Sequence, residues 1–140
     1  RNDRNVIMTR SADEFVELND RADLANRSRA SMFISIHADS CPRSAVRGFT
    51  VYVAKSASKE AVALGRAIER RMSAVVAHNL GVRRADYRVL VRTVCPAVLV
   101  ELGYLSNAFE ARKLSQRGYR RSLSDAISQG ILDYQEGRGR

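Results

Sequence analysis

Several residue types are scarce in this chain of 140 residues. It has no tryptophan, two prolines, two cysteines and no apolar run as long as a membrane-spanning helix. Cys41 and Cys95 are too few for a disulfide scaffold and lack the spacing of a zinc knuckle, so they form one disulfide or none. No internal repeat, linker or low-complexity segment interrupts the chain. These absences exclude transmembrane, collagen-like, coiled-coil and disulfide-rich classes and leave one globular domain.

The charge is strongly positive. Twenty-four Lys and Arg against 15 Asp and Glu give a formal net charge of +9, and the only lysines are Lys55, Lys59 and Lys113. Such a charge attracts polyanions, whether nucleic acid, anionic lipid or an anionic cell wall, although a genomic bias toward arginine explains the composition equally well. Five Tyr, four Phe and no pattern of a stacking platform or recognition helix argue against nucleic acid.

Apolar runs rich in β-forming residues alternate with helical patterns. The runs predict strands at residues 5–9, 32–37, 48–53 and 97–101, and a short strand at 88–91. Such alternation indicates an α/β domain. We expect a twisted, mostly parallel or mixed sheet covered by helices on both faces.

Apolar residues at helical spacing predict the helices between these strands. One helix carries Leu18 and ends near Asn26, and a long one begins after Ser58 as N-cap and stops around residues 79–81. Asn107 and Glu110 have the spacing of a capping box that opens a short helix. A last helix spans residues 123–134, so we expect a domain over residues 1–135 and a flexible tail over 136–140.

Two of the predicted strands end on an ionisable side chain. His37 follows the run FISI, and Glu101 follows the run AVLV. Ligands of open α/β sheets bind beyond the carboxyl ends of the strands, and burial of an ionisable group there is costly unless it has a partner. Alone, the histidine is explained by a local hydrogen bond and the glutamate by a salt bridge. Together they predict a metal site with an adjacent base.

The segments around these two residues resemble a known family. Residues 35–39 (SIHAD) and 98–107 (VLVELGYLSN) are similar to the two downstream signatures of zinc-dependent N-acetylmuramoyl-L-alanine amidases, which are bacterial cell-wall hydrolases. The likeness extends from residue 5 to residue 134. It implies that His37 is a zinc ligand and Glu101 the catalytic glutamate. The implied reaction is hydrolysis of the amide between N-acetylmuramic acid and L-alanine of the stem peptide, by water that zinc activates and Glu101 deprotonates.

The chain also departs from that family. The family pattern begins with a strand that leads to a zinc histidine, followed by a zinc glutamate, and neither is present in these 140 residues. We therefore expect a segment of a longer protein in which the first strand and two ligands are missing. Cys41 and His78 are poor substitutes, because the family gives Cys41 no such role and His78 follows a helical stripe. Arg10 and Arg21 either contact an anionic substrate or hold a sheet–helix junction, and the second role is favoured.

The resemblance implies peptidoglycan as the substrate, leaves an activator protein open as a partner, and places the protein in the periplasm or at the cell wall. From the composition we expect no nucleic-acid partner and no membrane span. Three alternatives remain open. The chain is an inactive fragment or pseudoenzyme that binds cell-wall glycan, a nucleic-acid binder suggested only by its charge, or a zinc hydrolase that acts on another amide.

Overall fold

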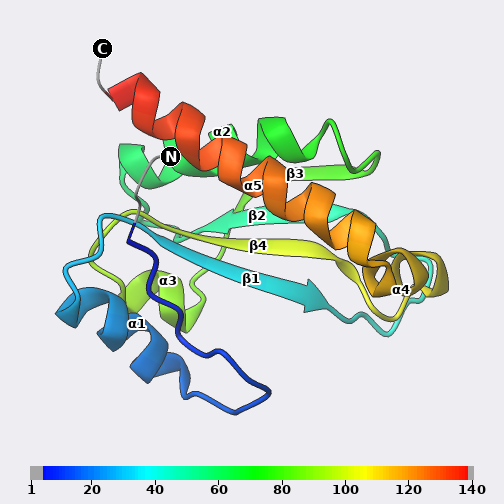
Figure 1. Ribbon diagram of the computed structural model, residues 1–140, viewed down its shortest axis with the longest axis horizontal. Helices are drawn as coiled ribbons and strands as arrows, with labels where there is room; N and C mark the ends of the chain where they lie inside the picture. Colours follow the sequence, from blue (N-terminus) through cyan, green and yellow to red (C-terminus); the bar gives the residue numbers. More distant parts are fainter. Residues whose placement is uncertain (1–4, 139–140) are drawn as a thin grey trace.

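The computed structural model describes residues 5–138, in which helices cover both faces of a mixed sheet (Figure 1). The strands are β1 (Phe33–Asp39), β2 (Phe49–Val53), β3 (Asn79–Arg84) and β4 (Ala97–Tyr104). The helices are α1 (Leu18–Arg27), α2 (Lys59–Met72), α3 (Arg88–Arg92), α4 (Ala108–Ser115) and α5 (Arg117–Arg138). The α/β fold class expected from the sequence is confirmed. Over this described range, no helix is both long and apolar enough to cross a membrane.

The sheet has the strand order β1-β4-β2-β3, with β4 inside it. β4 pairs in parallel with β1 and antiparallel with β2, while β2 pairs in parallel with β3. The apolar run that begins at Ala97 is continuous because β4 is flanked by strands on both edges and covered on both faces, so that its first five residues are all buried.

Each face of the sheet has its own apolar cluster. On one face, β2 and β4 pack against α2 and α5; the buried residues there are Phe49, Val51, Val53, Leu64, Ala67, Ile68, Met72, Val76, Val98, Val100, Leu114, Leu123, Ala126, Ile127 and Tyr134. On the other face, α1 and α3 cover a smaller cluster that consists of Ala25, Phe33, Ala54, Val89, Leu90, Ala97 and Leu99. Strand residues alternate between the faces, so odd-numbered residues of β1 and β4 point toward α1 and α3.

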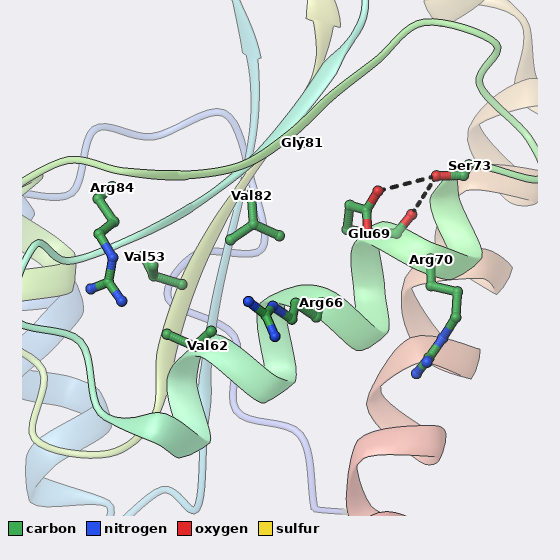
Figure 2. A pocket seen from close by; sticks show the side chains of 9 residues that line it. All are labelled: Val53, Val62, Arg66, Glu69, Arg70, Ser73, Gly81, Val82 and Arg84. Carbon is green, nitrogen blue, oxygen red and sulfur yellow. Dashed lines mark hydrogen bonds between the residues drawn. The ribbon is translucent and has the colours of Figure 1, made fainter.

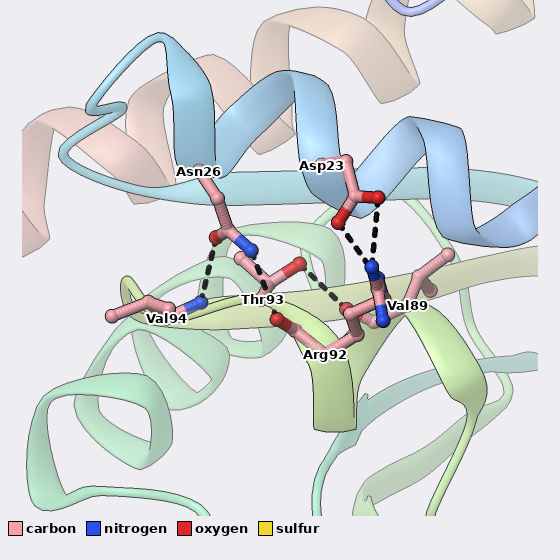
Figure 3. A network of polar contacts seen from close by, with 6 residues as sticks. All are labelled: Asp23, Asn26, Val89, Arg92, Thr93 and Val94. Atoms are coloured by element: carbon pink, nitrogen blue, oxygen red, sulfur yellow. Dashed lines mark hydrogen bonds and ion pairs between the residues drawn. The ribbon is translucent and has the colours of Figure 1, made fainter.

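Polar contacts fasten α1 to α3 and to the segment between α3 and β4 (Figure 3). The guanidinium of Arg92 donates two hydrogen bonds to the carboxylate of Asp23, at 2.7 and 2.8 Å. The Asn26 amide donates to the carbonyl of Arg92 at 3.0 Å and accepts from the N–H of Val94 at 2.9 Å. Asn26 therefore satisfies two backbone groups at the end of α3 and just after it, which no aliphatic side chain could do.

We expect Asn26→Ala to lower the free energy of unfolding by about 1–2 kcal/mol, because two backbone hydrogen bonds are lost. Chemical denaturation of the two proteins measures the difference. Asn19→Ala, an exposed position of the same helix, is the matched control and should change stability much less. Equal stability of Asn26→Ala and the unsubstituted protein would contradict this role.

Two predicted strands are wrong. Residues 5–9 form no strand and pair with none of the four described strands, and Val6, Ile7 and Met8 are 73%, 51% and 69% exposed. Residues 88–91 belong to the helix α3, in which Val89 and Leu90 are both buried against α1. Strand propensity did not decide either case, because a strand also needs a partner.

The long helix and the capping box differ in part from expectation. α2 has the predicted N-cap, Ser58, but ends at Met72 rather than near residue 80, and the following residues 79–84 form the strand β3, which the sequence did not predict. Asn107 caps α4 by accepting from the N–H of Glu110, yet the Glu110 side chain does not return to Asn107. α5 extends through Arg138, so residues 136–138 of the expected tail are helical; residues 139–140 lie outside the described range.

Candidate active site

The sheet brings His37 and Glu101 together. The two residues are Cα partners in the parallel pairing of β1 and β4, at the carboxyl ends of both strands. Odd-numbered residues of β1 and β4 point toward α1 and α3, so both side chains lie on the side of the sheet that these two helices cover. The juxtaposition that the sequence predicted for this pair is therefore present.

Glu101 is a buried carboxyl group with an unused oxygen. The residue is only 7% exposed, and its Oε2 has no hydrogen-bond partner among the described residues. Burial, followed by the negative charge of Asp39, raises the pKa of Glu101 from 4.5 to about 7. Buried polar atoms are nearly always paired, so an unpaired carboxylate oxygen at the end of a strand indicates a position that another group fills in use.

A second unpaired oxygen lies beside it. Thr50 is the antiparallel partner of Glu101 on β2, it is fully buried, and its Oγ1 also lacks a hydrogen-bond partner within residues 5–138. Thr50 could not be selected from the sequence, because the β2–β4 register, and not sequence distance, makes it a neighbour of Glu101. Two adjacent buried oxygens without partners form a polar spot that suits a water molecule.

His37 is held as a neutral imidazole. Burial lowers the pKa of His37, and the positive charges of Arg21 and Arg10 lower it further. Ser35 Oγ lies 2.8 Å from Nε2, a contact that orients the ring and leaves Nδ1 to face another group. A neutral imidazole with one nitrogen engaged by a hydroxyl group has the form that metal ligands take in proteins.

Arg10 and Arg21 bind backbone carbonyls within residues 10–21, so the sheet–helix junction that the sequence favoured for them is wrong. Arg10 donates to the carbonyl of Glu14 at 2.9 Å, and Arg21 donates to the carbonyl of Val16 at 2.9 Å. Both thereby fix the segment that leads into α1. Their charges also act on His37, so they tune the imidazole while they order the chain.

Two tyrosines flank the same face of the sheet. The rings of Tyr52 and Tyr87 meet edge to face with centroids 5.1 Å apart. Burial raises the pKa of Tyr87 to about 12, with smaller contributions from Tyr52, Glu101 and Asp39. The alternation of residues along β2 is the sequence signal that places Tyr52 on the same face as Thr50. No sequence signal indicates that Tyr87 lies beside Tyr52.

The described residues do not form a complete metal site. Across residues 5–138, no group of three or more His, Cys, Asp and Glu side chains is placed to hold an ion. Cys41 and Cys95 are free thiols, so no disulfide joins them. His78 lies in the loop before β3, where its carbonyl accepts from the N–H of Phe49. His37 is therefore the one predicted ligand that lies at the carboxyl end of the sheet beside Glu101.

A surface groove of about 660 Å³ lies elsewhere, between α2 and β3 (Figure 2). Its lining residues are Val53, Val62, Arg66, Glu69, Arg70, Ser73, Gly81, Val82 and Arg84. Glu69 is engaged there in a side-chain network with Ser73 and Asn79, and Arg84 donates to the carbonyl of Lys55 at 2.7 Å. The groove contains neither His37 nor Glu101, so it is distinct from the candidate active site.

Comparison with known proteins decides the family. Residues 1–133 match the Amidase_3 family, whose members are described as N-acetylmuramoyl-L-alanine amidases. The chain belongs to this family. The matched range contains both predicted site residues of this amidase-family chain, His37 and Glu101, and every strand of its sheet.

Individual relatives agree with the family match. The amidase-family chain is 37% identical over 130 residues to the probable cell wall amidase LytH of Staphylococcus epidermidis, covering 92% of this chain and 42% of LytH. The catalytic domain of CwlV, an N-acetylmuramoyl-L-alanine amidase from Bacillus (Paenibacillus) polymyxa, superposes with a TM-score of 0.87 at 35% identity, covering 94% and 73% of the two chains. The CwlD amidase of Clostridioides difficile, solved in complex with the GerS lipoprotein, gives a TM-score of 0.80 at 30% identity, covering 85% and 61%.

Proposed function

We propose that this amidase domain hydrolyses the amide bond between the lactyl group of N-acetylmuramic acid and the L-alanine of the stem peptide. The observation that carries the proposal is the pairing of His37 and Glu101 at the carboxyl ends of β1 and β4, with a buried Glu101 oxygen that no described group uses. The family match supports the class of bond, and the similarity to cell-wall amidases supports the polymer. The chain spans only 42% of LytH, so the substrate of the whole protein is part of the proposal.

Glu101 is the proposed general base. Burial raises the pKa of Glu101 to about 7, which suits a group that must both accept and release a proton. Glu101 takes a proton from the attacking water, and then donates it to the nitrogen of the departing L-alanine. The low exposure of the site strengthens its electrostatics, because little bulk water screens the charges that form there.

His37 is the proposed zinc ligand of this chain. A catalytic zinc ion uses three protein ligands and keeps one position open. The neutral imidazole of His37 suits one of them, but residues 5–138 do not provide the full set, so a zinc site with His37 needs donors beyond these residues. When bound, zinc would polarise the amide carbonyl and lower the pKa of a bound water molecule.

Two further parts of the proposal concern the surroundings. We place this domain outside the cytoplasmic membrane, in the periplasm or at the cell wall, because its proposed substrate, peptidoglycan, is found there. The CwlD amidase forms a complex with a lipoprotein, which supports a partner protein for this domain. The net charge of +9 favours contact with an anionic wall.

Incubation of purified peptidoglycan with zinc and the full-length protein that carries this domain tests the proposal. We expect new amino-terminal L-alanine, detected by amine labelling and mass spectrometry, and a rate that falls in EDTA and is restored by zinc. His37→Ala should lower the zinc content measured by elemental analysis, whereas His78→Ala should leave it unchanged. Binding to peptidoglycan without release of amino groups would favour the alternative of a non-catalytic glycan-binding domain.

A further inference from the structure

The ladder between β2 and β4 ends at the candidate base. Their antiparallel pairing runs from Tyr52 and Leu99 to Thr50 and Glu101, and goes no further among the described residues. Just beyond this point, the carboxylate of Glu110 lies between the two strands. Its Oε1 accepts from the N–H of Gly48 and its Oε2 from the N–H of Tyr104, each at 2.7 Å.

The fit around this carboxylate is close. Glu110 is only 9% exposed, and its own N–H is held by the Asn107 side chain at 3.2 Å. A Cβ on Gly103 would lie 3.0 Å from Glu110 Oε2, and the φ of +153° at this residue disfavours any side chain. The strand therefore passes directly over the carboxylate, with glycine at the point of contact.

The position of Glu110 links it to Glu101. Tyr104 lies three residues after Glu101 on β4, and Gly48 lies two residues before Thr50, immediately before β2 begins. One side chain thus takes the place of the next two ladder hydrogen bonds and sets how far the strands separate. Charge-assisted hydrogen bonds to a carboxylate are short and strong, so this link is stiffer than a pair of neutral bonds.

We propose that Glu110 is a positioning residue, which holds β2 and β4 at the separation that places Glu101 for proton transfer. This inference rests on the proposed function, because it concerns the geometry of the proposed base. Displacement of a catalytic group by about 1 Å is enough to lower a rate by about 100-fold. Glu110 touches no reacting atom, and it acts through the backbone at either side of Glu101.

The test compares Glu110→Gln with Thr93→Val, a control that also removes a buried hydrogen bond, here the 2.6 Å bond from Thr93 Oγ1 to the carbonyl of Val89. In Glu110→Gln we expect the amide protons of Gly48 and Tyr104 to shift upfield in NMR spectra and to exchange faster, and the amide signal of Glu101 to move. We expect kcat on peptidoglycan to fall by about 10- to 100-fold, with KM and zinc content within about twofold of the unsubstituted protein. Thr93→Val should destabilise the fold while kcat stays within about twofold of the unsubstituted value.

Unchanged amide signals, or equal losses of kcat in both variants, would overturn the positioning role. If the unsubstituted protein does not cleave the muramoyl amide, the proposed function fails, and the NMR comparison still decides the inference. Movement of the Glu101 signal in Glu110→Gln alone supports it in that case. A Glu101 signal that stays in place contradicts it.

Discussion

Glu101→Gln is expected to lower kcat for amide hydrolysis by about 10²- to 10⁴-fold, the range that a general base contributes. Glutamine keeps the shape and the hydrogen-bonding reach of the side chain, but its amide cannot accept the proton of the attacking water. Because the exchange leaves the surrounding sheet unchanged, KM and the zinc content should stay within about twofold. Steady-state hydrolysis of purified peptidoglycan, together with elemental analysis, measures all three quantities.

Glu136→Gln supplies the matched control for that experiment. Glu136 is an exposed carboxylate of α5, so the same chemical change there should leave kcat unaltered. Retention of turnover in Glu101→Gln would remove Glu101 as the base. A loss of zinc parallel to the loss of kcat would instead assign Glu101 a role at the metal.

Glu101→Gln should also stabilise the metal-free protein at alkaline pH. The pKa of Glu101 is about 7 in the folded state and about 4.5 in an unfolded chain, so the folded state binds the proton more tightly. The free energy of unfolding therefore falls as the pH rises from about 4.5 to about 7. Above that range Glu101→Gln lacks the buried charge and should be more stable by about 3 kcal/mol, while below about pH 4 the difference should vanish.

Urea denaturation at several pH values, in EDTA, measures this difference. An increase in the free energy of unfolding would be informative, because most substitutions of buried residues lower it. A constant difference between the two proteins from pH 4 to pH 9 would show that Glu101 titrates alike in the folded and unfolded states. The site would then lack the burial that the structure gives it.

The strands that carry the site could be predicted because their signal is local and strong. β1 and β4 are apolar runs that lead to His37 and Glu101. β4 is buried between covered faces and needs such a run, whereas β1 lies at the sheet edge and shows the same signal through its β-forming residues. β3 could not be predicted in this way. It is an edge strand with the sequence NLGVRR, and it contains a glycine with φ of +82°. Its residues have little strand propensity of their own, and the pairing with β2 stabilises the extended conformation.

The residues that lie near Glu101 could not be predicted from sequence distance. Thr50 is its neighbour only through the β2–β4 register, and Tyr87 reaches the site from the segment before α3. Glu110 has the sequence spacing of a capping residue, yet its carboxylate binds two strands because Gly103 leaves room for it. Capping statistics describe the local helix end, and tertiary contacts decided the role of this side chain.

Hydrolysis in H₂¹⁸O with mass spectrometry of both products shows directly which bond is cleaved. We expect one ¹⁸O in the lactyl carboxylate of N-acetylmuramic acid, and an unlabelled stem peptide that begins with a free L-alanine amine. In Glu101→Gln the same products should form at least about 100 times more slowly. Label at a glycosidic or peptide carbon, or peptidoglycan that stays intact with fully zinc-loaded protein, would contradict the assignment of this chain as a muramoyl-L-alanine amidase.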